Sequence, residues 1–248
     1  MKNVTIQSDA ILIAAGKTNS GRSYIANPIP GTTEDGIAGE RRVRPVGGIA
    51  KRAFDIALSI VAIVLLAPLL LGIALLIRAT SPGPVFYGHA RVGFDGRLFT
   101  CWKFRTMVVN SDVVLARHLR DDPAARREWD ETFKLRDDPR VLPLGRVLRK
   151  LSIDELPQLY NILIGDMSVV GPRPVVRAEL QRYGSVARYY IAARPGLTGL
   201  WQVSGRNDTS YRLRTVLDRF YVSRQTLLLD LWIVIRTVPA VLASRGAC

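Results

Sequence analysis

The chain has 248 residues, a formal net charge of +14 and a hydrophobic content of 48%. That apolar content excludes a disordered polyelectrolyte, because such chains lack the hydrophobic residues that a folded core needs. The two cysteines, Cys101 and Cys248, lie far apart and form no CxxC spacing, which excludes a disulfide-framed secreted domain. A chain that is both basic and apolar leaves two partners open, a membrane surface and a nucleic acid.

Residues 1–45 have the composition of a disordered polar tail. Gly, Ser, Thr, Asn and Pro interrupt this segment, and no periodic apolar pattern persists along it. We therefore predict three parts, which are the tail over residues 1–45, a membrane helix with basic flanks over residues 46–80, and a folded domain over residues 81–248.

The segment from Ile56 to Ile77 carries no charged residue. As a straight helix it would be roughly 33 Å long, which is about the hydrocarbon thickness of a bilayer. Pro68 stands near its middle, where a proline removes a helix hydrogen bond and bends the helix. Both flanks are basic, and the positive-inside bias cannot be satisfied at both ends of a single crossing. These features favour a re-entrant helix, with a kinked span as the alternative.

Beyond this helix the pattern predicts an α+β domain that is mainly helical. Strands are expected at 85–87 and 98–104 around a turn at 93–96, and helices at 107–120, 154–163, 175–182, 186–193 and 210–222. Residues 226–243 are apolar at helical spacing, which fits either an amphipathic helix on the membrane interface or an ordinary packed helix. The acidic segment 121–138 is interpreted as a solvated face or lid without chemistry.

Two adjacent carboxylates, Asp154 and Glu155, stand at the start of a predicted helix. One interpretation is structural, because Ser152 and Glu155 match a capping box and early acids complement the helix dipole. The other interpretation is chemical. Neighbouring carboxylates can hold Mg²⁺ beside a phosphate, and a carboxylate can attack phosphorus to form an acyl phosphate.

Basic segments near this acidic pair favour the chemical interpretation. Arg173 lies between two prolines, so its backbone has little freedom and the guanidinium can be aimed at small entropic cost. A glycine-punctuated loop further on combines guanidinium and amide groups that suit a nucleotide diphosphate. The candidate substrate-binding residues are Lys103, Arg105, Arg149, Arg173, Arg194, Arg206 and Asn207.

Four segments carry a resemblance to a known family, namely KFRTM (103–107), LRKLSIDELPQL (148–159), GDMSVVGPRP (165–174) and RPGLTGLWQVSGRN (194–207). In order and spacing they resemble the signatures of the bacterial sugar transferases. These are monotopic phosphoglycosyl transferases that begin exopolysaccharide and O-antigen assembly on polyprenol phosphate. The similarity runs from about residue 45 to the C-terminus. Within the family the chain most resembles the short rhizobial galactose-1-phosphate transferases.

The resemblance implies the roles of the acidic pair. Asp154 would attack the β-phosphate of a UDP-sugar and release UMP, and Glu155 would support phosphate positioning and Mg²⁺ binding. Both carboxylates would be metal ligands, and undecaprenyl phosphate would then accept the sugar phosphate. Arg149 and Arg173 match family positions that face phosphate.

The resemblance also implies the architecture and location. A re-entrant helix broken at Pro68 would precede a small catalytic α/β domain with interfacial amphipathic helices, on the cytoplasmic side of the bacterial inner membrane. One departure concerns Ala67, because many relatives have Ser before the proline at the helix break. A Ser hydroxyl could satisfy a freed carbonyl, whereas Ala cannot, so a neighbour or water must do so.

The expected partners are a UDP-sugar, undecaprenyl phosphate and membrane lipid. Galactose is the expected sugar, and glucose is the alternative within the family. A non-catalytic basic membrane anchor is the rival from another class. Nucleic-acid binding is disfavoured, because aromatic residues are not interleaved with the basic run as a stacking platform requires. The oligomeric state stays open, with a homodimer among the options.

Overall fold

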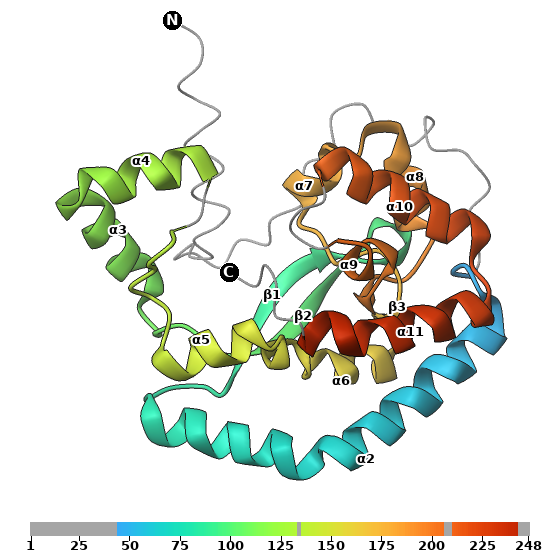
Figure 1. Cartoon of the computed structure of the whole chain (residues 1–248), viewed down its shortest axis with the longest axis horizontal. Helices are drawn as coiled ribbons and strands as arrows, with labels where there is room; N and C mark the ends of the chain where they lie inside the picture. The colour runs from blue at the N-terminus through green and yellow to red at the C-terminus, as the bar shows by residue number, and fades with distance from the viewer. Residues whose placement is uncertain (1–43, 133–134, 206–209, 243–248) are drawn as a thin grey trace, which may run out of the picture.

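A computed structural model describes residues 44–132, 135–205 and 210–242. Most of the predicted tail, together with Arg206 and Asn207, lies outside the described residues. The fold is α+β and mainly helical, as predicted (Figure 1). In chain order the elements are α2 (Gly48–Thr80), β1 (Phe86–Val92), η1 (Phe94–Gly96), β2 (Leu98–Phe104), α3 (Ser111–Asp121), α4 (Pro123–Thr132), α5 (Pro143–Lys150), η2 (Ile153–Glu155), α6 (Gln158–Ile164), β3 (Ser168–Val170), α7 (Arg177–Gln181), η3 (Gly184–Val186), α8 (Ala187–Ile191), β4 (Gly196–Thr198), α9 (Leu200–Val203), α10 (Tyr211–Arg224) and α11 (Leu227–Leu242).

The apolar segment forms one continuous helix, α2, which is long and apolar enough to cross a membrane. Only 11% of its most apolar 18-residue stretch is buried, so the middle of the helix is not a core element of the domain. Figure 1 shows that α2 changes direction near its middle, and Pro68 lies inside it. The proline therefore bends the helix without dividing it, because the turns on either side keep their own hydrogen bonds.

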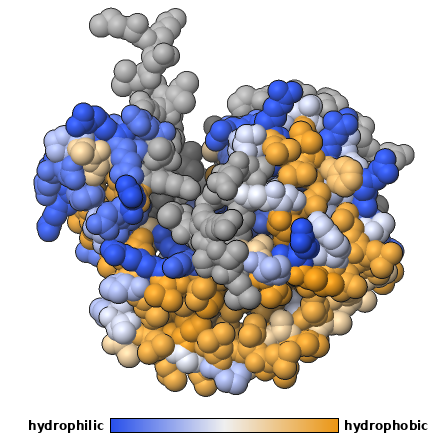
Figure 2. All heavy atoms as spheres, viewed as in Figure 1, coloured by the Kyte–Doolittle hydropathy of each residue, from blue (hydrophilic) through white to orange (hydrophobic). Residues whose placement is uncertain are grey.

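Both ends of α2 are packed against the domain. Near the N-terminal end, Lys51, Asp55 and Ser59 are buried, and near the C-terminal end Ile73 and Ile77 are buried. The last two side chains belong to a cluster with Phe104 of β2 and Leu148 of α5. Figure 2 shows that apolar surface gathers along the side of the molecule that α2 forms. The helix is thus anchored at its ends and exposed between them.

The predicted hairpin is confirmed. Strands β1 and β2 pair in antiparallel register from Phe86 opposite Phe104 to Val92 opposite Leu98. The connection contains η1, where Asp95 and Gly96 have positive φ values of 58° and 73°. Such left-handed residues suit a tight turn, and Asp and Gly are the residue types that tolerate this conformation best.

A second sheet was not foreseen. Strands β3 and β4 pair in parallel, with Ser168 opposite Gly196 and Val170 opposite Thr198. A Cβ atom on Gly196 would lie only 2.1 Å from the backbone nitrogen of Gly171, so the two chains approach closely because Gly196 has no side chain. Three-residue strands are too short for an alternating pattern, which explains why periodicity missed them.

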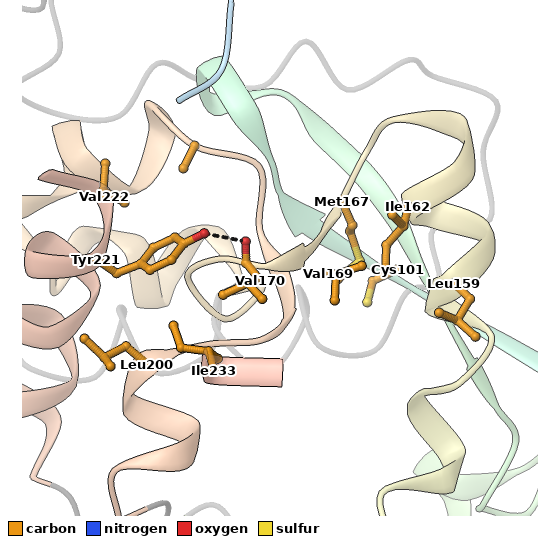
Figure 3. Close-up of a cluster of buried hydrophobic side chains, with 11 residues drawn as sticks. Cys101, Leu159, Ile162, Met167, Val169, Val170, Leu200, Tyr221, Val222 and Ile233 are labelled. Carbon is orange, nitrogen blue, oxygen red and sulfur yellow. Dashed lines mark hydrogen bonds between the residues drawn. The ribbon is translucent and has the colours of Figure 1, made fainter. Parts of the chain in front are cut away.

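The main hydrophobic core surrounds this parallel pair and collects side chains from β2, α6, α9, α10 and α11 (Figure 3). The Tyr221 hydroxyl donates to the carbonyl oxygen of Val170 at 2.9 Å, which ties α10 to β3. Ile162 and Met167 are fully buried on the other side of β3. The two signature segments that contain β3 and β4 are therefore held in one rigid block.

Other helices depart from the expected pattern. The helix predicted over 107–120 begins at Ser111, because Met107 instead forms a β-bridge with Val141. Helices α4 and α5 were not predicted, and α4 falls in the acidic segment. Helix α11 buries Asp230 and Ile233 while Leu228 is 80% exposed. One face of the helix packs on the domain, as the packed-helix interpretation predicts, and another presents apolar side chains outward. Contact of that outer face with a membrane interface stays a prediction.

A buried acid on α10 makes stability depend on pH. Burial raises the pKa of Asp218 to about 8, although the Tyr183 hydroxyl donates to its Oδ2 at 3.0 Å. Above the unfolded-state pKa the folded state holds a proton that the unfolded state has lost, so stability falls as pH rises toward 8. Asn does not titrate, so the free energy of unfolding of Asp218→Asn should not show this fall. Relative to wild type, we expect it to rise by about 2 kcal/mol from pH 6 to pH 8. Urea unfolding of both proteins in detergent at pH 6 and pH 8 measures this change. The same stability difference between variant and wild type at both pH values would contradict the prediction.

Candidate active site

The acidic pair lies in a short 3₁₀ turn, η2, directly before α6. Ser152, which precedes the turn, has φ 55° and ψ 20° and makes no side-chain capping bond. The capping-box interpretation is therefore wrong. A non-glycine residue with positive φ costs of order 1–3 kcal/mol, and such strain clusters at functional sites. The turn holds Asp154 in a buried position.

Glu155 is the anionic centre of a charge cluster. Its Oε1 lies 2.7 Å from Nζ of Lys103, which projects from β2, and 3.3 Å from Nη2 of Arg173. Burial alone would raise the pKa of Glu155, but the two cations and their hydrogen bonds overcome this and lower it to about 2. Glu155 is thus firmly ionised and fixes both cations.

Asp154 differs from its neighbour in its electrostatic surroundings. Burial raises its pKa above the ordinary value, and Lys103, with Nζ at 4.0 Å from Oδ2, opposes that rise. Glu155 adds repulsion, while Arg149 adds attraction. A carboxylate with a raised pKa is more basic and a better nucleophile than an ordinary one. Two adjacent carboxyls whose pKa values are pushed apart suit two different roles.

Arg149 approaches from α5 on another side. Its Nε donates to Oγ1 of Thr106 at 2.8 Å, and its positive charge opposes part of the rise in the pKa of Asp154 that burial causes. The structure therefore brings together five of the predicted residues, which are Lys103, Arg149, Asp154, Glu155 and Arg173.

A small pocket opens beside Glu155, and part of its lining was missed from the sequence. It is lined by Arg91, Cys101, Lys103, Glu155, Gln158, Arg173, Pro174 and Leu197. Strand alternation could have found two of these residues. The register places Arg91 opposite Phe99 and His89 opposite Cys101, so Arg91, Cys101 and Lys103 share one face of the hairpin.

Two predicted arginines are held elsewhere. Arg105 donates to the carbonyl oxygens of Ser81 and Pro82 at 2.8 and 2.7 Å, in the turn that follows α2. Arg194 donates from Nε to the carbonyl oxygen of Gly165 at 2.8 Å, beyond the C-terminal end of α6. Both guanidinium groups donate to backbone carbonyl oxygens and not to the acidic pair. Substrate contact by either residue stays a prediction, as it does for Arg206 and Asn207.

The acidic pair fits one kind of metal site. In the described part of the chain, no group of three or more His, Cys, Asp or Glu side chains gathers around a common point. Asp154 and Glu155 supply two carboxylates, and both ionic contacts of Glu155 use Oε1. Mg²⁺ is commonly held by one or two carboxylates together with substrate phosphates, without a complete protein cage. The donor set matches that arrangement.

The model of the bacterial sugar transferase family matches residues 46–244, which include both the long apolar helix and the acidic pair. The chain belongs to the bacterial sugar transferase family. It is therefore an enzyme that transfers a group, which disfavours the rival interpretation as a non-catalytic anchor. The resemblance drawn from the four signature segments is confirmed.

Several curated relatives of this sugar transferase are similar over most of its length. It is 55% identical to the "Exopolysaccharide production protein ExoY" of Sinorhizobium fredii over 205 residues, covering 83% of this chain and 91% of the relative. It is 52% identical to a "UDP-galactose-lipid carrier transferase" of Erwinia amylovora, covering 79% and 41%. It is 42% identical to a "UDP-glucose:undecaprenyl-phosphate glucose-1-phosphate transferase" of Caulobacter vibrioides, covering 80% and 72%.

Proposed function

We propose that this sugar transferase moves a hexose 1-phosphate from a UDP-sugar to undecaprenyl phosphate, with release of UMP, and thereby starts an exopolysaccharide repeat unit. The names of the relatives support the reaction class. The single observation that carries the proposal is the buried Asp154 beside an ionised Glu155 that holds Lys103 and Arg173. Galactose is the first choice of sugar, because two galactose-transferring relatives are 52% identical and the glucose relative is 42% identical.

The proposed reaction has two displacements at one phosphorus atom. A carboxylate oxygen of Asp154 attacks the β-phosphorus of the UDP-sugar. The bond from that phosphorus to the bridging oxygen breaks, and UMP leaves with the electron pair. The sugar phosphate is then an acyl phosphate on Asp154. A phosphate oxygen of undecaprenyl phosphate attacks the same phosphorus, the bond to Asp154 breaks, and the carboxylate is restored.

The surrounding residues have separate parts in this scheme. Lys103 and Arg173 offset negative charge on the phosphoryl oxygens, and Glu155 keeps the two cations in place. Arg149 stabilises the carboxylate form of Asp154 before attack. Mg²⁺, held by Asp154 or Glu155 together with substrate phosphate, would supply further neutralisation of the diphosphate charge.

Isotope exchange tests the covalent step separately from overall turnover. Purified enzyme is incubated with UDP-galactose and labelled UMP in the absence of undecaprenyl phosphate. We expect label to appear in UDP-galactose, because the first displacement is reversible without the lipid. The same assay with UDP-glucose shows for which of the two UDP-sugars the exchange is faster. Full turnover with lipid but no exchange without it would contradict the acyl-phosphate intermediate.

We also propose that α2 is re-entrant and that the domain lies on the cytoplasmic side of the bacterial inner membrane. The support is the packing of both helix ends on one domain. Lys51 and Asp55 contact β3 and α11, whereas Ile77 packs near Phe104. A helix that crossed the bilayer would separate its ends by about 30 Å of hydrocarbon, and one folded domain could not then hold both.

Thiol labelling tests the topology. A cysteine is placed in the N-terminal tail of a variant with alanine at positions 101 and 248, and intact cells are treated with a membrane-impermeant maleimide. We expect no labelling until the cells are opened, because the basic flanks on both sides of α2 stay in the cytoplasm. Labelling of the tail in intact cells would mean that α2 crosses the membrane.

A further inference from the structure

Gln158 is an unexplained residue in the pocket beside the acidic pair. It is the first residue of α6, is only 2% exposed and lines the pocket with Lys103, Glu155 and Arg173. Within the described parts of the chain, no group hydrogen-bonds to its side-chain amide. An amide that lines a pocket without a protein partner has its donor and its acceptor groups available to a bound molecule. The amide is therefore suited to a ligand.

The pocket walls combine two chemistries. Arg91, Lys103 and Arg173 supply positive charge, whereas Pro174 and Leu197 supply apolar surface. A phosphate group needs only the first, but the C–H face of a sugar ring packs well on the second. Gln158 adds a neutral group that both donates and accepts hydrogen bonds, which is the pattern that a sugar hydroxyl matches.

We propose that this pocket is the subsite for the transferred hexose and that the Gln158 amide hydrogen-bonds to one of its hydroxyl groups. The inference rests on the proposed function, in which Asp154 attacks the phosphorus that carries the sugar. The hexose is one bridging oxygen away from that phosphorus, so it must lie beside the acidic pair. The Arg173 side chain, which lines this pocket, is 42% exposed, so the pocket is open to solvent on that side.

Substitution of Gln158 by Met gives the sharpest test, because Met has a similar length and volume but lacks the amide. The value of kcat/KM is measured for UDP-galactose and for analogues that each lack one ring hydroxyl. With UDP-galactose we expect Gln158→Met to lower kcat/KM by about 10-fold to 100-fold. With the analogue that lacks the contacted hydroxyl, variant and wild type are expected to agree within about twofold, because no hydrogen bond is left to lose.

The control makes the same chemical change on the surface. Gln181 is exposed at the end of α7, so Gln181→Met is expected to match wild type on every substrate. If Gln158→Met does not fold, Gln158→Asn retracts the amide and should give the same substrate pattern.

An equal loss on UDP-galactose and on every deoxy analogue would overturn the sugar contact, since the amide would then act on the phosphate or on the fold. If wild-type enzyme released no UMP from any UDP-hexose, the proposed function itself would fail, and this inference with it.

Discussion

Replacing Asp154 with Asn is expected to lower kcat for UMP release by about 10⁴-fold or more. The amide has almost the same shape as the carboxylate but cannot form the acyl phosphate, so the first displacement is lost. Asn also carries no charge, so Lys103, which lies 4.0 Å from Asp154, loses one of its two anionic partners among the described residues and keeps Glu155. UMP release from UDP-galactose with undecaprenyl phosphate measures the effect, and exchange of labelled UMP should disappear together with it.

The matched control is Asp218→Asn, which makes the same substitution at a buried acid on α10. Asp218 contacts Tyr183 and not the acidic pair, so its variant should keep UMP release close to the wild-type rate. A rate for Asp154→Asn within tenfold of wild type would rule out Asp154 as the nucleophile. The proposed chemistry would then require a different acceptor for the phosphoryl group.

Replacing Lys51 with Met is expected to destabilise the fold by about 3–5 kcal/mol, which is the largest stability effect that the structure indicates. Nζ of Lys51 lies 2.9 Å from Oδ1 of Asp55 and 3.1 Å from Oδ2 of Asp230, and all three side chains are buried. Met fills a similar volume but leaves two buried carboxylates without a cation between them.

The ion cluster of Lys51, Asp55 and Asp230 joins distant parts of the chain. Asp55 also accepts from Oγ of Ser168 at 2.8 Å, and Asp230 accepts from the Tyr221 hydroxyl at 2.7 Å. The start of α2 is thereby tied to β3 and α11. Loss of the central lysine should loosen the attachment of the membrane helix as well as the core of the domain.

Urea unfolding in detergent at neutral pH measures the loss. Lys150→Met serves as the control, because Lys150 is exposed and its replacement should change stability by no more than about 0.5 kcal/mol. Adding Asp230→Asn to Lys51→Met should recover part of the stability, since one of the two unpaired charges is removed. Equal stability of Lys51→Met and wild type would show that the ion cluster does not hold these elements together.

Much of the architecture follows from local sequence. The uncharged segment from Ile56 to Ile77 predicts a membrane helix because hydrophobicity and length act within one segment. The hairpin of β1 and β2 follows from strand-like residues on either side of a short turn. Asp154 and Glu155 are adjacent in the chain, so their proximity needed no tertiary information. Four signature segments in order and spacing were enough to indicate the family.

Other parts of the site depended on contacts across the chain. Arg105 and Arg194 lie in signature segments, yet their guanidinium groups donate to backbone carbonyl oxygens and not to the acidic pair. Arg91 and Gln158 lie in the pocket, although neither was a candidate from the sequence. The direction in which a side chain points depends on strand register and packing, which a motif does not contain.

By itself, the sequence determined the long apolar helix, the hairpin and the acidic pair, because short-range hydrophobicity, turn chemistry and adjacency produce each of them. Only the tertiary structure decided how the two carboxylates differ. Lys103 reaches Glu155 across 52 positions of the chain, and Arg173 reaches the same oxygen from another segment, while burial raises the pKa of Asp154. Burial and through-space charge act between residues that folding brings together, so the division of roles between neighbouring acids arises only in the folded chain.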